Sequence, residues 1–185
     1  CLEIFGIKMT SFAAIVGAAA LAIGLGFQGS LSNLAAGVML LVFRPFKVGD
    51  FVRVAGQAGT VGEIDLFMTE IDTADGRRVI LPNGQIFGNT IENITHHPRR
   101  RVEVAVGVGY GADIDRTREV LEAAVRAAAP VLADPAPEVN LSELGPSSVN
   151  WHVRAWTRRE NYGASHQSIV REVKNALEAA GIAVP

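Results

Sequence analysis

The chain has 185 residues, with 17 Lys plus Arg against 19 Asp plus Glu and a formal net charge of −2. This near-neutral balance excludes a strongly basic protein that captures nucleic acid by charge alone. The single cysteine, Cys1, has no partner in the chain, which excludes an intrachain disulfide and a cysteine zinc site.

The charges are distributed unevenly along the sequence. Residues 1–43 carry only Glu3 and Lys8, and every residue from Met9 to Phe43 is uncharged. That run is much longer than the roughly 18 apolar residues that indicate a membrane-spanning helix, and longer than the apolar region of about 7–15 residues in a signal peptide. We therefore expect a membrane segment at 1–43 and a normally charged body after it.

The apolar run is interrupted at Gln28 and Gly29 by a polar amide and a flexible residue. This interruption predicts two helices. Residues 9–27 would reach about 28 Å, which matches a bilayer core of about 30 Å. Residues 30–43 are too short to cross and have apolar positions at helical spacing, so we expect them to lie along the membrane surface.

Basic residues near the ends of the span predict its orientation. Lys8 precedes it, and Arg44, Lys47 and Arg53 follow it. The excess of positive charge after the span places the C-terminal body in the cytoplasm. Because Cys1 is an unusual first residue, we also expect upstream spans in the full-length protein.

Small residues dominate the spanning segment and predict close packing with other helices. Leu21 and Leu25 lie one turn apart, and identical copies packed in a ring would point them at its axis, where leucine rings form a dry constriction. The alternative, an ordinary packing helix inside a bundle, stays open. The small residues form two neighbouring faces: Ala14, Ala18 and Ala22 on one, and Gly17, Ala20 and Gly24 on the other.

Residues 51–95 have the pattern of a small β-barrel. Short runs rich in Val, Ile, Thr and Phe alternate with turns at 55–56, 74–76 and 82–84, each of which contains glycine. No long helix fits this region. We therefore expect a compact β domain directly after the membrane segment.

The pattern changes after Pro98. Valine alternates at 102, 104, 106 and 108, and a helix follows in which Ile114, Leu121, Ala124, Val125 and Ala128 share a face. A hairpin about Gly145-Pro146 comes next, and then a helix from about 163 to 180 that Gly181 ends. The order βαββα is ferredoxin-like.

Several motifs together closely resemble the small-conductance mechanosensitive channel family, MscS. They cover nearly the whole chain: GLGFQGSLSNLAAG at 24–37, RPFKVGD at 44–50, TADG at 73–76, LPNG at 81–84, GVGY at 107–110 and AGI at 180–182.

The resemblance implies a homoheptamer in the bacterial inner membrane that opens under tension and releases ions and small solutes in hypo-osmotic shock. Its partners would be membrane lipids and its own copies, with no cofactor, metal or enzymatic activity. It implies a pore helix and an interfacial helix at 1–43, an Sm-like β domain at 44–98 and a ferredoxin-like α/β domain at 99–185.

The resemblance also assigns roles within the membrane segment. It implies that Leu21 and Leu25 are the gate and that Gln28 and Gly29 mark a kink between the pore-lining and interfacial halves. Ala20 and Gly26 depart from the family pattern, which has Gly and Ala there. Gly29 and Gly37 are the easiest places for the helix to bend, although both could instead be close-packing sites.

The sequence also contains patterns that are typical of other functions. Gly107, Gly109 and Ala112 match G-x-G-x-x-A of dinucleotide sites, but Asp113 and Asp115 would repel a pyrophosphate. A membrane-tethered RNA-binding or nucleotide-binding protein is the alternative, yet aromatic residues for base stacking are only 6% of the chain.

Clusters of His and Arg were also considered. His96 and His97 are adjacent, so on an extended segment they point to opposite sides and suit a metal poorly. Arg99, Arg100 and Arg101 are more typical of a solvated strand edge or a charged lining of the solute path than of a nucleic-acid site.

Overall fold

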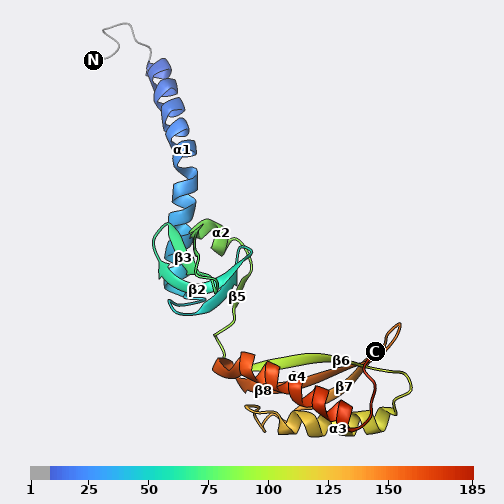
Figure 1. Ribbon diagram of the computed structural model, residues 1–185. Helices are drawn as coiled ribbons and strands as arrows, with labels where there is room; N and C mark the ends of the chain where they lie inside the picture. Colours follow the sequence, from blue (N-terminus) through green and yellow to red (C-terminus); the bar gives the residue numbers. More distant parts are fainter. Residues whose placement is uncertain (1–8) are drawn as a thin grey trace. The chain divides into compact units, whose positions relative to one another are not determined.

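A computed structural model describes residues 9–185. The chain divides into two compact units, with the boundary in the sequence between His96 and His97. The first unit contains a long helix and a β-sheet, and the second contains a sheet with two long helices (Figure 1). Helix bounds are α1 Met9–Phe43, α2 Asn83–Phe87, α3 Ile114–Ala127, the 3₁₀ helix η2 Arg159–Asn161 and α4 Tyr162–Ala179. Strand bounds are β1 Phe51–Val54, β2 Gln57–Ile64, β3 Met68–Asp72, β4 Arg78–Pro82, β5 Ile91–Asn93, β6 Arg99–Val108, β7 Glu138–Leu144 and β8 Val149–Arg158.

α1 is one helix of 35 residues, not the two that the interruption at Gln28 and Gly29 predicted. A glycine in the interior of a helix destabilises that helix by only about 1 kcal/mol relative to alanine. Its backbone N–H still donates a hydrogen bond, so the helix can continue through Gly29. The helix ends where Arg44 adopts a positive φ of 47° and Pro45 follows, because proline restricts the preceding residue to non-helical conformations.

The β domain is a five-stranded antiparallel sheet in the order β4-β3-β2-β1-β5. Ala55 and Gly56 both have positive φ, 46° and 77°, in the two-residue turn between β1 and β2, as a tight hairpin requires. The sequence predicted a turn at 82–84, but Asn83 instead begins the short helix α2. The core of the domain includes Leu40 of α1. The other core residues are Phe46, Val52, Val54, Val61, Ile71, Leu81 and Ile86.

The second unit confirms the predicted βαββα order. Its antiparallel sheet has the strand order β6-β8-β7, and the buried residues of α3 and α4 form one cluster with alternate residues of β6 and β8. Trp151 at the centre of β8 is fully buried. Ile114 differs from the prediction, because it lies in the first turn of α3 and is 42% exposed. The opposite face of the sheet carries polar side chains.

Candidate functional site: the apolar helix and its contact with the β domain

The first half of α1 has no protein around it within the described chain. Every residue from 12 to 32 is exposed, and the helix passes the length and hydropathy criteria for a membrane span over Phe12–Phe43. A Cβ atom added at Gly17, Gly24 or Gly29 would meet nothing within 4 Å. In Figure 1 this half of α1 projects away from the β domain. Its surfaces are therefore available to lipid or to other helices.

The two candidate gate leucines lie between the two small-residue faces. With 3.6 residues per turn, Leu21 and Leu25 fall on one stripe, with Ala18 and Ala22 on one side of it. The glycine face, Gly17, Ala20 and Gly24, lies on the other side. Both leucines are strongly exposed, at 65% and 63%. The small residues therefore flank the two leucines on both sides, and nothing in the described chain covers the leucines.

The second half of α1 packs against the β domain through a very close backbone contact. Gly37 is buried, and a Cβ atom there would lie 2.1 Å from the carbonyl oxygen of Leu66. Ala36 and Leu40 are buried beside it, at 7% and 1% exposure. Because only glycine allows this approach, the contact supports the close-packing interpretation of Gly37. Gly29 has no such contact.

A hydrogen bond reinforces this contact. The backbone N–H of Gly84, in the first turn of α2, donates to Asn33 Oδ1 at 2.9 Å. The N–H groups in the first turn of a helix have no partner within the helix, so α1 supplies an acceptor that α2 otherwise lacks. Asn33 was not singled out from the sequence, although a polar amide in an apolar helix was a possible signal.

Asn83 holds the loop that touches Gly37. Its side chain is fully buried. It accepts a hydrogen bond from Thr69 Oγ1 at 2.8 Å and donates from Nδ2 to the Asp65 carbonyl at 2.7 Å, while its backbone N–H donates to the Phe67 carbonyl at 3.0 Å. These bonds fix the segment around Leu66 against the helix. The sequence indicated only a turn residue here.

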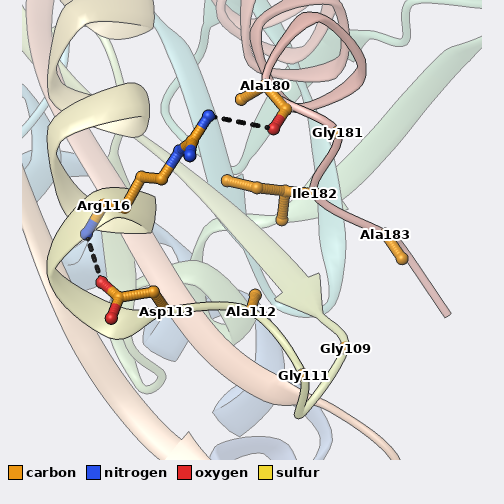
Figure 2. Close-up of a pocket in the computed structure, with 9 residues that line it drawn as sticks. All are labelled: Gly109, Gly111, Ala112, Asp113, Arg116, Ala180, Gly181, Ile182 and Ala183. Carbon is orange, nitrogen blue, oxygen red and sulfur yellow. Dashed lines mark hydrogen bonds between the residues drawn. The ribbon is translucent and has the colours of Figure 1, made fainter.

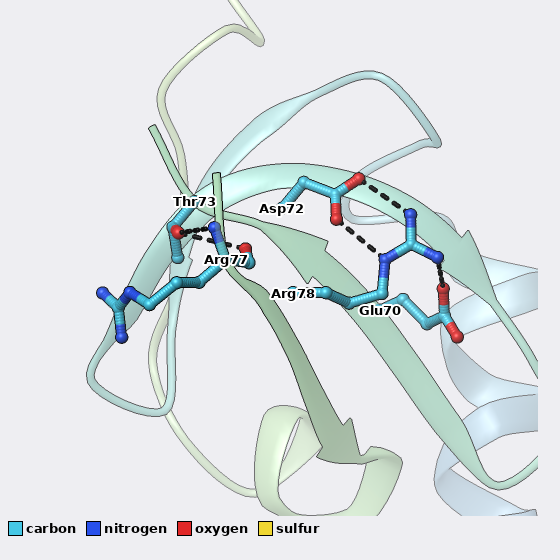
Figure 3. Close-up of polar contacts among 5 residues, drawn as sticks. All are labelled: Glu70, Asp72, Thr73, Arg77 and Arg78. Carbon is cyan, nitrogen blue, oxygen red and sulfur yellow. Dashed lines mark hydrogen bonds and ion pairs between the residues drawn. The ribbon is translucent and has the colours of Figure 1, made fainter. Parts of the chain in front are cut away.

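Charged side chains cover the outer face of β3 and β4 (Figure 3). Arg78 Nε and Nη2 donate to the two carboxylate oxygens of Asp72 at 2.9 and 3.1 Å, and Nη1 lies 2.8 Å from Glu70. The hydrogen bonds from Arg78 lower the pKa of Asp72. Thr73 Oγ1 bonds both the N–H and the carbonyl of Arg77, which closes the turn between the strands. This network orders β4, an edge strand.

A polar clasp joins the segment after α1 to the end of β5. The Asp50 carboxylate accepts hydrogen bonds from the Lys47 N–H at 2.9 Å, from Asn93 Nδ2 at 2.8 Å and from Thr95 Oγ1 at 3.2 Å. Although partial burial raises the pKa of Asp50, these hydrogen bonds outweigh it and lower that pKa. Asn93-Ile94-Thr95 matches the sequence motif for N-glycosylation, but in the structure the side chains of Asn93 and Thr95 bind Asp50 and close the β domain.

The glycine motif of the second unit borders a hollow of about 450 Å³ (Figure 2). Asp113 caps α3 by accepting from the Arg116 N–H at 2.8 Å, and the Gly109 N–H donates to the Ala183 carbonyl at 2.8 Å. Two of the N–H groups that a pyrophosphate would use are therefore occupied. The strand pairs of this sheet are antiparallel, so the parallel βαβ unit of a dinucleotide site does not form.

Residues 9–185 contain no candidate metal site, because no three His, Cys, Asp or Glu side chains lie together there in a way that could hold an ion.

The basic residues that predict the orientation of the span lie on both sides of it. Lys8 lies outside the described residues. Arg44 and Lys47, between α1 and β1, and Arg53, within β1, are all exposed.

Comparison with known proteins gives two family matches. Residues 29–96 match the family described as mechanosensitive ion channel, beta-domain, and residues 102–184 match mechanosensitive ion channel MscS, C-terminal. The first match begins inside α1, at residue 29, and the two matches together include most of both units.

Individual relatives match over the whole chain or most of it. The chain is 42% identical to an uncharacterized MscS family protein of Synechocystis over 185 residues, which is 100% of this chain and 62% of that protein. It is 43% identical to the small-conductance mechanosensitive channel of Edwardsiella ictaluri over 168 residues, 91% of this chain and 59% of that protein. The chain thus spans about three fifths of these curated relatives.

A solved structure is similar over the whole chain. The closed-state crystal structure of Helicobacter pylori MscS superposes with a TM-score of 0.92 at 29% identity, covering 100% of this chain and 73% of that one.

Proposed function

Because the chain belongs to the MscS family of mechanosensitive ion channels, we propose that its protein is a channel that opens under membrane tension and releases ions and small solutes in hypo-osmotic shock. The family resemblance and the fold class expected from the sequence, an apolar helix followed by a β domain and an α+β domain, are both confirmed. The activity of the whole protein is an inference from this membership.

One observation carries the proposal: the first half of α1 is apolar and exposed on all sides, and its small residues have no contacts of their own. In water such a surface is unfavourable. Lipid can cover the larger side chains, but a helix face of Ala and Gly suits close approach by another helix. A ring of identical copies satisfies both faces at once.

The ring that we propose is a homoheptamer in the bacterial inner membrane. Ala18 and Ala22 of one copy would pack against Gly17, Ala20 and Gly24 of the next. Leu21 and Leu25 would then point inward and form two stacked apolar rings, too narrow and dry for hydrated ions. The body after α1 would lie in the cytoplasm, and the full-length protein would cross the membrane more than once.

Opening follows from the area of the ring in the membrane plane. Tension favours the conformation with the larger area, so a ring that widens by tilting its helices gains population as tension rises. Small residues let neighbouring helices slide past one another with few steric obstacles. As they tilt, the leucine rings retract and the pore fills with water.

The contact between α1 and the β domain would determine how α1 returns to its closed position after opening. Gly37 against Leu66, with the Asn33–Gly84 bond beside it, holds the second half of α1 on the domain. Gly29 lies between this fixed half and the pore half, so we propose that the helix, which is continuous in the single chain, bends at Gln28 and Gly29 in the channel. Gly37 would contribute packing.

The test is single-channel recording from tension-controlled patches. The full-length protein that contains this chain is expressed in cells that lack other mechanosensitive channels. We expect a conductance that appears above a reproducible tension and disappears on release. Purified protein reconstituted in phospholipid should show the same activity. A protein that assembles in the membrane but passes no current up to patch rupture would contradict the proposed function.

A further inference from the structure

The exposed sheet face of the second unit has a feature that channel gating does not use. β6 begins with Arg99 and β8 ends with Arg158, and the antiparallel register places these two residues directly opposite each other. Opposite residues in such a pair have Cβ atoms about 4.5–5.5 Å apart. Two arginine side chains, which are always charged, therefore leave the sheet next to each other.

A third arginine extends the cluster on the same face. Because side chains alternate along a strand, Arg101 lies on the side of Arg99, whereas Arg100 lies on the helix-covered side, where its guanidinium sits 3.8 Å from the centre of the Tyr162 ring. Arg101 is paired in register with Trp156. The arginine cluster is thus Arg99, Arg101 and Arg158.

Neighbouring acidic groups neutralise this cluster only in part. Arg99 donates only a long bond of 3.5 Å to a backbone carbonyl, that of Asp134. Arg101 reaches Glu103 at 3.5 Å, but that carboxylate lies closer to His152 and Arg154, at 2.9 and 3.0 Å. Arg158 is exposed and forms no salt bridge within residues 9–185.

Like charges placed directly opposite each other on a sheet disfavour that pairing. The second unit has equal numbers of acidic and basic side chains, 11 of each in residues 97–185. The arginines at one end of the sheet therefore form a local positive patch in a unit whose charges otherwise balance. An anion bound between the two guanidinium groups would remove the repulsion. A phosphate group suits them best, because each planar guanidinium can donate two parallel hydrogen bonds to it.

We propose that Arg99, Arg101 and Arg158 form a binding site for a phosphate group. The site is independent of the proposed channel function, since none of its residues belongs to α1 or to the contact of α1 with the β domain. The phosphate can come from a free solute or from a lipid headgroup, and the same arginines would recognise either.

The experiment is a thermal unfolding series on the full-length protein in phosphatidylcholine nanodiscs. Inorganic phosphate is compared with sodium chloride at equal ionic strength, and a second set of nanodiscs contains phosphatidylglycerol. We expect phosphate to raise the Tm by about 2–4 °C above the chloride value. A rise with phosphatidylglycerol in chloride alone identifies the headgroup as the source. Because phosphate also stabilises folded proteins in general, a rise with free phosphate identifies a solute where Arg158→Gln abolishes it.

Arg158→Gln separates binding from structure. In chloride we expect its Tm to equal or exceed that of the parent, because the substitution removes a like-charge contact, and we expect it to lose the phosphate response. Arg171→Gln is the matched control, since Arg171 is an exposed arginine with a carboxylate neighbour, Glu172 at 3.4 Å. It should keep the full response.

Three results would overturn the proposal. Equal Tm values in phosphate and chloride, with no effect of phosphatidylglycerol, would show that there is no site. A parent-like phosphate response in Arg158→Gln would place binding elsewhere. A change of oligomeric state in Arg158→Gln, measured by mass photometry, would show that the arginines pair with a neighbouring copy of the chain.

Discussion

Asn33 Oδ1 accepts a hydrogen bond from the backbone N–H of Gly84 at 2.9 Å, across 51 residues of sequence. This bond ties an apolar helix to the first turn of a helix in another part of the fold. It lies beside the contact of Gly37 with Leu66, so one polar and one steric interaction hold the same surface together.

Asn33→Leu should loosen this surface, because the Gly84 N–H loses its acceptor. A hydrogen bond of this kind contributes about 1 kcal/mol, so exchange of the Gly84 amide with solvent should quicken by about fivefold. Hydrogen–deuterium exchange measures it. Asn33→Asp keeps an acceptor oxygen and should exchange like the parent. Equal protection in Asn33→Leu would show that the bond contributes nothing.

Gly37→Ala and Gly29→Ala should act in opposite directions. A methyl group at residue 37 would lie 2.1 Å from the Leu66 carbonyl oxygen, whereas one at residue 29 meets nothing within 4 Å. We expect Gly37→Ala to destabilise the first unit by about 1–3 kcal/mol, and Gly29→Ala to stabilise the helix by up to about 1 kcal/mol.

Thermal unfolding compares the stability of the two variants. Recording under sustained tension then tests bending, since Gly29→Ala should slow desensitisation. If Gly37→Ala unfolds like the parent, the close contact does not constrain α1.

Asp50→Asn should weaken the clasp at neutral pH. The folded state lowers the pKa of Asp50, so the carboxylate stabilises the fold above its ordinary pKa, and this contribution disappears as the pH falls through the folded value. We expect a loss of about 1–2 kcal/mol at pH 7 and a smaller difference near pH 3.

Denaturant unfolding at both pH values measures this difference. Glu92→Gln, which breaks an exposed pair with Arg53, is the control and should change stability little at either pH. A deficit of Asp50→Asn that is the same at pH 7 and pH 3 would disprove the role of the charge.

Leu21→Ser should lower the tension needed to open the channel, because a hydroxyl in the proposed constriction favours water there. Ile23→Ser is the matched control, since residue 23 lies on the side of the helix opposite Leu21 and is exposed to a similar extent, 62% against 65%. Patch recording gives both thresholds. A larger shift for Ile23→Ser would move the gate to another face.

Ala18→Val and Ala22→Val should raise the threshold, because a branched side chain on the packing face obstructs the sliding of neighbouring helices. Ala19→Val, off both small-residue faces, should change it less. The three thresholds are compared in the same membrane. Unchanged tension for all three variants would argue against packing through these alanines.

The sequence predicted the type and order of the elements well, because hydrophobic periodicity reports which residues are buried. Val102, Val104 and Val106 are buried as expected, and the predicted helix at 163–180 is observed at Tyr162–Ala179. It predicted a break at Gln28 and Gly29 that the isolated chain does not show, since the energetic penalty of one glycine is small in a long helix.

The contacts between α1 and the β domain could not be predicted. They depend on residues far apart in sequence, such as Asn33 and Gly84, and on a carbonyl oxygen at Leu66 that no side-chain pattern reports. Asn83 looked like a turn residue because Pro-Asn-Gly is typical of turns, and only its burial shows its hydrogen-bonding role. The gate and packing assignments stay predictions.

The Asp50 clasp has a mechanical consequence. The chain enters the β domain near Asp50 and leaves it near Thr95, and the Asp50–Thr95 bond spans 45 residues of sequence. A pull between the end of α1 and the start of the second unit would therefore act on this short bridge and on the neighbouring β1–β5 pair before it reached the other strands. Strain at the end of α1 could then pass to the start of the second unit where the two ends of the β domain lie side by side, while Gly37 and Asn33 hold α1 on the domain.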